Sequence, residues 1–169
     1  MYPSLSRLFL FAALLLGVSA CASGPKFDTS VVDRALVPTA VAADIDAARG
    51  RTAMWGGAIV NSRNFENSSQ LEVLAYPLDD AGRPRLDQPP LGRFLVQRAG
   101  YLETVDYAPG RLVTMIGPVA GVRSGTVGEA RYDYPVLEAR QLHLWPRSEA
   151  AGRSTNPQFH FGIGIGVIR

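Results

Sequence analysis

The middle of the chain carries short apolar or alternating runs that have the length and composition of β-strands. Turns rich in glycine and proline separate these runs, most clearly in the loop from Asp79 to Pro90. The expected strands lie at residues 52–60, 71–76, 93–97 and 112–122, and a fifth region covers 131–134 and resumes at 141–145. Five short strands joined by turns predict a small, mainly β domain.

Glycine and proline inside the predicted strands indicate a sheet that bends on itself. Gly56 and Gly57 lie in the first strand, where glycine usually marks a bulge or a barrel corner. Pro118 in the fourth strand indicates a bulge or an unpaired edge, and residues 124–126 are a candidate hairpin turn. With one helical turn expected at 103–107, the pattern favours a small closed or partly closed OB-like barrel. A β-sandwich is the alternative.

A tether and a short helix are predicted before the strands. Residues 21–38 begin with small and turn-forming residues, and we expect them to hold the folded part away from its anchor. The helix is expected from Thr39 to Ala48, with Thr39 as its cap and Gly50 just past its end. Because this helix is short, it needs to pack on the domain to persist.

The C-terminal tail, residues 148–169, contains a strictly alternating segment from Phe159 to Ile168. Apolar side chains alternate there with residues that are mostly glycine, which gives one apolar face and one nearly bare face. Such a strand could pack within the monomer, on another copy of the chain or on a membrane, or it could be disordered. A transmembrane barrel needs many such segments and is therefore not expected. Both tails of the chain are predicted to be flexible.

The N-terminal segment has the layout of a secretory signal that ends on the chain's single cysteine. Arg7 precedes an apolar stretch from Leu8 to Val18, which is shorter than the roughly 20 residues that a membrane-spanning helix needs. The run Val18-Ser19-Ala20-Cys21 resembles the lipobox of bacterial lipoproteins. That resemblance implies removal of residues 1–20 and attachment of lipid to Cys21. The alternative is ordinary secretion with a free thiol, since a single cysteine cannot form a disulfide within the chain.

The residues around Cys21 also indicate where a lipoprotein of this kind is held. Each buried CH₂ group contributes ~0.8 kcal/mol, so two or more acyl chains anchor a protein stably. Ala22 and Ser23 follow the cysteine, and the aspartate that usually retains lipoproteins in the inner membrane is not there. By resemblance to that sorting rule, we expect the outer membrane of a Gram-negative envelope, with the domain facing the periplasm.

The net charge of the chain argues against a polyanionic partner. The chain has 17 basic and 15 acidic side chains, and loss of Arg7 with the signal segment leaves a formal balance of +1. Neither sign accumulates in a run, so we expect no nucleic-acid partner.

Few residues of the mature sequence are suited to catalysis or metal binding. Its histidines are His143 and His160, whereas a zinc site needs three or four clustered ligands. His143 lies in a predicted strand, and we interpret it as a half-exposed strand residue. Asp79 and Asp80 lack the alternating carboxylates of a calcium loop and indicate a solvated turn. We therefore predict no catalytic residues, no metal, no cofactor and no enzymatic activity.

The aromatic residues of the predicted strands are the candidate ligand-binding groups. On an OB-like barrel, exposed aromatic rings can stack on sugar rings. Trp55 and Trp145 are the leading candidates, with an envelope glycan or a peptide as the ligand. The competing interpretation is that these rings fill the barrel and cap its ends.

Six motifs between Arg51 and Trp145 are distinctive in combination. They are Trp55-Gly56-Gly57, Leu71-Glu72-Val73-Leu74-Ala75-Tyr76-Pro77-Leu78, Gly92-Arg93-Phe94, Tyr107-Ala108-Pro109-Gly110-Arg111, Tyr132-Asp133-Tyr134-Pro135 and Leu142-His143-Leu144-Trp145-Pro146. This set resembles the Slp family of outer-membrane lipoproteins, named for a starvation-inducible member. One departure is Glu103-Thr104, where relatives tend to carry Asp-Pro. The resemblance implies an outer-membrane location and a β-rich fold, and it brings no reaction with it.

These observations predict four segments: a signal peptide at 1–20, a tether at 21–38, an Slp-type β-barrel domain at 39–147 and a tail at 148–169. The expected function is that of a non-enzymatic, outer-membrane-anchored lipoprotein with a structural role in the envelope or in stress. The alternative is an OB-like module that binds an envelope glycan or a peptide. The expected partner is the outer membrane, through lipid on Cys21, and self-association is a further possibility.

Overall fold

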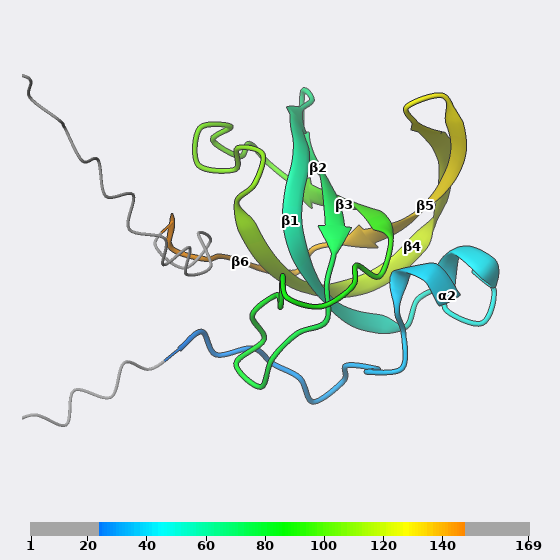
Figure 1. Ribbon diagram of the computed structural model, residues 1–169, viewed down its shortest axis with the longest axis horizontal. Helices are drawn as coiled ribbons and strands as arrows, with labels where there is room; N and C mark the ends of the chain where they lie inside the picture. Colours follow the sequence, from blue (N-terminus) through cyan, green and yellow to red (C-terminus); the bar gives the residue numbers. More distant parts are fainter. Residues whose placement is uncertain (1–23, 148–169) are drawn as a thin grey trace, which may run out of the picture.

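A computed structural model describes residues 24–147 of the chain (Figure 1). It contains one short helix and six strands. Their bounds are α2 Pro38–Ala43, β1 Thr52–Asn64, β2 Ser68–Ala75, β3 Arg93–Ala99, β4 Leu112–Val127, β5 Ala130–Glu138 and β6 Gln141–Leu144. The predicted signal peptide, Cys21 and the C-terminal tail lie outside the described residues.

Five of the strands close into a ring. β1 pairs antiparallel with β2, β2 pairs antiparallel with β3, and β3 pairs parallel with β5. β5 pairs antiparallel with β4, which returns to β1 and completes the ring. β6 adds to the edge of the first half of β4. The prediction of a mainly β fold with closed strands and a short N-terminal helix is confirmed.

β4 changes partner in its middle, which is how the ring closes. Its first half pairs with β1 as far as Pro118, and its second half pairs with β5 from Val119 onward. The register of the second pairing shifts between Val119 and Gly121, so the bulge predicted from Pro118 is present nearby. The expected hairpin turn at 124–126 is wrong, because these residues pair with β5. The chain turns instead at Gly128, whose φ of 59° suits glycine.

The predicted fifth strand region is divided between two strands that occupy different edges. β5 ends at Glu138 beside β3, and β6 begins at Gln141 beside β4. The connection crosses from one edge to the other: the Ala139 N–H donates to Gln97 O, and the Arg140 N–H donates to Ile116 O.

α2 is shorter than predicted and begins one residue earlier. It starts at Pro38, whose fixed φ suits the first helical position, so Thr39 is not the cap. Val37 is the N-cap residue, and it makes no side-chain capping bond. The helix ends at Ala43, and Asp44 Oδ1 then accepts the Ala47 N–H of a separate turn. No helix within residues 24–147 is long and apolar enough to cross a membrane.

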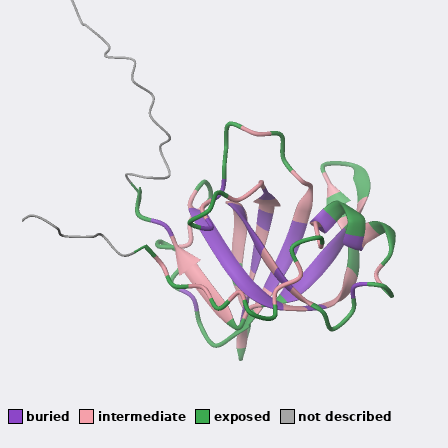
Figure 2. Ribbon diagram, turned by 90° about the horizontal axis from the view of Figure 1, so that it is seen from below, coloured by how far each residue is buried: buried purple, intermediate pink, exposed green. Residues whose placement is uncertain are grey.

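The hydrophobic core fills the inside of the ring (Figure 2). Alternate residues of each strand point inward, as the burial pattern of β2 shows most regularly. The core includes Val41, Trp55, Ile59, Leu71, Val73, Phe94, Val96, Val113, Met115 and Leu137.

The segment that precedes α2 packs along the ring. The ring of Phe27 meets that of His143 on β6 edge-on, with centroids 6.1 Å apart. Val32 forms a parallel bridge with Thr52, and Asp33 forms an ion pair with Arg51. The chain is therefore fixed to the folded body from Phe27 onward.

Candidate ligand groove

Residues 121–136 form a hairpin arm, which consists of the end of β4, the turn after it and most of β5. This arm contacts an outward-facing side chain of β2 and the backbone of β3. Arg123 Nη1 on the arm donates to Gln70 Oε1 on β2 at 2.6 Å. The Tyr134 hydroxyl lies 3.4 Å from Glu72 Oε1 on the same strand. A groove of about 270 Å³ lies between the arm and the outer sides of β1 and β2.

The alternation of β1 and β2 explains why the floor of this groove is polar. Leu71 and Val73 point into the core, so Gln70 and Glu72 point outward. On β1, Arg63 lies opposite Gln70 and Asn61 lies opposite Glu72. Polar side chains of two neighbouring strands therefore share one outer face, and all four line the groove.

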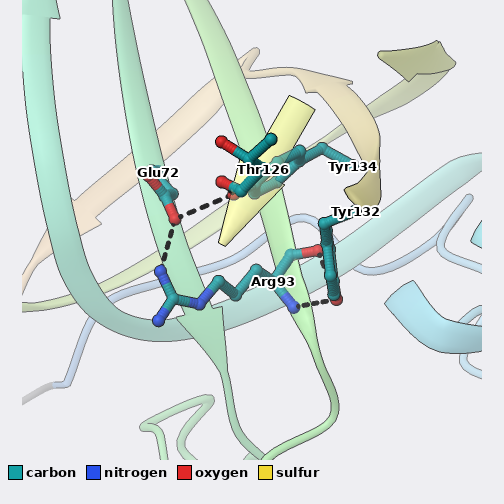
Figure 3. A network of polar contacts seen from close by, with 5 residues as sticks. All are labelled: Glu72, Arg93, Thr126, Tyr132 and Tyr134. Atoms are coloured by element: carbon teal, nitrogen blue, oxygen red, sulfur yellow. Dashed lines mark hydrogen bonds and ion pairs between the residues drawn. The ribbon is translucent and has the colours of Figure 1, made fainter. Parts of the chain in front are cut away.

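A network of polar contacts holds the arm against the sheet (Figure 3). Arg93 Nη1 donates to Glu72 Oε1 at 2.6 Å, and the Tyr134 hydroxyl donates to Thr126 O at 2.9 Å. The Arg93 backbone N–H donates to the Tyr132 hydroxyl at 2.7 Å. The Arg93–Glu72 bond lies within the sheet and the Tyr134–Thr126 bond within the arm, whereas Tyr132 and the Tyr134–Glu72 contact link the arm to the sheet.

Tyr134 is held in the network by its ring as well as by its hydroxyl. Its ring packs with Leu95 and Val136 in a small cluster beneath the arm. Burial, and then the negative charge of Glu72, raises the pKa of Tyr134 above its ordinary value. A Cβ atom at Gly125 would lie 3.0 Å from the Tyr134 ring, so a glycine at this position lets the ring lie close to the arm's backbone.

The charge at the mouth of the groove is positive. Arg63 is the strand partner of Gln70 on β1, and Arg123 donates a hydrogen bond to Gln70 from the arm. Glu72 is the acidic residue of the lining, and its ion pair with Arg93 balances its charge. Guanidinium groups in this position can bind a carboxylate or a phosphate through paired hydrogen bonds.

A second cavity of about 530 Å³ lies between the N-terminal segment and the loop after β2. Phe27, Leu36, Met54 and Leu78 line it together with several polar residues. Gly82 closes it on one side, because a Cβ atom there would lie 2.6 Å from the Met54 methyl. The charged residues of its lining are Arg34, Asp79 and Asp80, so acidic side chains outnumber basic ones there, in contrast to the groove.

Both candidate tryptophans are buried. Trp55 is 4% exposed, donates from Nε1 to Leu36 O at 2.8 Å and meets the ring of Phe94 edge-on. Trp145 is 5% exposed and donates from Nε1 to Thr114 Oγ1 at 3.0 Å. Neither ring presents a face to solvent in this structure, so stacking on a ligand would require the covering segments to move. Ligand contact by either residue stays a prediction.

The other residues considered for chemistry lie in structural positions. His143 is half-buried on β6, with its ring edge-on to Trp145 at 4.6 Å. Asp79 Oδ1 accepts the N–H groups of Ala81 and Arg83, which confirms the expected turn. Within residues 24–147, no group of three His, Cys, Asp or Glu side chains could hold a metal ion.

The groove was missed by sequence reasoning, which considered aromatic rather than polar residues. The outward position of Glu72 follows from alternation within the strand predicted at 71–76, whereas Gln70 lies just before that predicted range and within the observed β2. The contact of that strand with Arg123 and Tyr134, more than 50 positions further along the chain, depends on the bend in β4.

The family profile described as the outer membrane lipoprotein Slp family matches residues 18–164. The match includes the run that leads to Cys21 as well as every strand of the ring.

Two curated relatives are similar over most of this chain. The uncharacterized lipoprotein YeaY of Escherichia coli K12 is 32% identical over 118 residues, which are 68% of this chain and 61% of the relative. An uncharacterized protein of Haemophilus influenzae is 29% identical over 145 residues, 82% of this chain and 75% of the relative. The match thus spans less than two-thirds of the length of the E. coli lipoprotein.

Among solved structures, the similarity is weak. The mitochondrial single-stranded DNA binding protein Rim1 of S. cerevisiae matches with a TM-score of 0.37 and 14% identity, over 56% of this chain and 94% of that chain. Pot1pC of Schizosaccharomyces pombe bound to ssDNA matches with a TM-score of 0.32 and 12% identity, over 60% of this chain and 83% of that chain. These scores are too low to bear on a ligand of this chain.

Proposed function

This chain belongs to the Slp family of outer membrane lipoproteins, and from that premise we propose that it is a non-enzymatic structural element of the envelope, held by lipid on Cys21. The observation that carries this proposal is the extent of the family match, which begins at Val18 and so includes the lipobox-like run. The lipobox-like run and the folded ring thus lie within the same family match, which supports the proposal.

The packing of the N-terminal segment supports a position close to the membrane. Phe27 is the first residue with a ring contact to the folded body, and it follows Cys21 by six positions. Even fully extended, such a connection spans roughly 20 Å. A lipid on Cys21 would therefore hold the ring near the periplasmic leaflet of the outer membrane.

The closed ring suits a structural role in the envelope. A ring of paired strands leaves few open edges for unwanted pairing with other chains. The role under stress is inferred from the family alone, whose name comes from a starvation-inducible member.

The test compares strains that lack the gene and carry either the wild-type gene, Cys21→Ser or Ser23→Ala as a matched control. We expect starved cells without the gene to become more permeable to a large antibiotic such as vancomycin. The wild-type and Ser23→Ala genes should restore the barrier, and Cys21→Ser should not, because its product lacks the anchor. Equal permeability in all strains, or full rescue by Cys21→Ser at equal protein levels, would contradict the proposal.

A further inference from the structure

We propose that the groove between the arm and the outer face of β1 and β2 binds an acidic sugar unit of an envelope glycan. The proposal goes beyond the structural role argued above and does not depend on lipid attachment for binding. It rests on the charge, the hydrogen-bonding groups and the rigidity of the groove.

The positive charge of the groove selects an anionic group. Arg63 on β1 and Arg123 on the arm both line the groove and both neighbour Gln70, Arg63 as its strand partner and Arg123 through a hydrogen bond. Glu72 does not cancel them, because Arg93 Nη1 already lies 2.6 Å from its carboxylate. A carboxylate or phosphate suits two guanidinium groups, each of which presents a planar fork of donors.

The remaining lining favours a sugar over a peptide. Asn61 and Gln70 contribute amide groups, which can pair with the neighbouring hydroxyls of a sugar ring. Leu95 is the apolar residue of the lining, and it is only 6% exposed. The groove therefore has no apolar pocket for a peptide side chain. Its volume of about 270 Å³ is just below the range of drug-sized pockets and suits one substituted sugar ring.

The groove is held open before any ligand arrives. The Tyr134 hydroxyl bonds to Thr126 O, and its ring packs against Gly125 and Leu95. The Tyr132 hydroxyl ties the arm to the Arg93 backbone (Figure 3). A site fixed in this way loses little conformational freedom on binding, which favours affinity.

The groove also lies where a glycan could reach it. The tips of the β1–β2 and β4–β5 hairpins point away from the N-terminal segment (Figure 1). If that segment is anchored as proposed above, the groove faces the periplasm.

Calorimetry with the full lipidated chain in detergent micelles tests the proposal. Two of the ligands are acidic sugars: the disaccharide of N-acetylglucosamine and N-acetylmuramic acid, which has a carboxylate, and glucosamine phosphate. The other two are chitobiose, which is neutral, and a dipeptide of alanine and glutamate. We expect at least one acidic sugar to bind about tenfold or more tightly than chitobiose, as a charge-assisted contact would allow. Preference for the carboxylate would indicate the cell-wall glycan, and preference for the phosphate would indicate a lipid headgroup.

Variants on the groove wall locate the binding. Arg63→Gln and Arg123→Gln should each weaken binding of the acidic sugar about tenfold, because each removes a charged donor. Arg98→Gln, an exposed position on β3 outside the groove, should leave it unchanged. Binding of the dipeptide alone, equal binding of chitobiose, no binding at all, or an equal loss in Arg98→Gln would overturn the proposal. Failure here would leave the Cys21 permeability experiment unaffected.

Discussion

At the scale of single residues, Tyr134 joins the arm to the ring. Its hydroxyl bonds to the arm's own backbone at Thr126 O, while its ring covers Leu95 on β3. A buried phenol whose hydroxyl is already used as a donor resists ionisation, and the neighbouring charge of Glu72 adds to that resistance. The proton of Tyr134 is thus coupled to folding, because the folded protein holds it more firmly than the unfolded chain does.

This coupling predicts an alkaline loss of stability. Since the pKa of Tyr134 is raised above its ordinary value of 10.0, the unfolded chain loses this proton first as the pH rises. The free energy of unfolding should therefore fall above pH ~10, by at most about 1.4 kcal/mol per pH unit from this group. Tyr134→Phe should flatten the decline and cost about 1 kcal/mol at neutral pH through the lost hydrogen bond.

Urea unfolding from pH 7 to 11 measures both effects. Tyr101→Phe is the matched control, because Tyr101 is 69% exposed. Identical alkaline profiles for the two variants would show that Tyr134 carries no special coupling.

Residue types alone could not show where the groove lies or whether the two tryptophans are buried. Trp55 and Trp145 could lie inside the ring or on its surface, and their positions were settled by tertiary contacts with Leu36 and Thr114. The polar groove residues look like ordinary surface positions in the sequence. They become a site only where the bend in β4 brings Arg123 to Gln70.

At the scale of elements, closure of the ring depends on glycines at its tightest contacts. A Cβ atom at Gly57 would lie 1.9 Å from Leu74 O on β2, and one at Gly117 would lie 1.8 Å from Glu138 O on β5. Both obstacles are backbone atoms of paired strands, which cannot move aside as a flexible side chain can. These two glycines therefore allow β1 and β4 to bend between their successive partners.

Gly57→Ala should accordingly lower the free energy of unfolding by about 1–3 kcal/mol, the usual cost of overpacking. Gly121→Ala is the matched control, because the nearest atom to a Cβ at that position is the flexible end of Arg49, 3.5 Å away. The control should change stability by less than about 0.5 kcal/mol. Equal denaturation midpoints for the two variants would contradict the role assigned to Gly57.

The strands were the elements that could be predicted best, because their apolar and alternating runs are local signals. The hairpin at Gly128 was misplaced by a few residues, since glycine at 125 and glycine at 128 are equally plausible turn positions until the pairing is known. The start of α2 was misjudged for a similar reason: Pro38 and not Thr39 begins the helix.

At the scale of the whole molecule, the fold and the proposed anchor place two surfaces at opposite ends. The N-terminal segment packs along β6 and the start of β1, and the groove lies between the hairpins that point away from it (Figure 1). Because Phe27 follows Cys21 by only six positions, the connection to a lipid on Cys21, as proposed, would be too short to let the ring range widely. The proposed orientation of both surfaces at the membrane therefore rests on lipid attachment at Cys21.

Mass spectrometry of the N-terminal tryptic peptide, from protein purified out of membranes, shows whether that lipid is present. We predict a peptide that begins at Cys21, ends at Lys26 and carries the added mass of a diacylglyceryl group and an amide-linked acyl chain. A mature chain that begins at another residue, or a Cys21 with a free thiol, would contradict lipid anchoring.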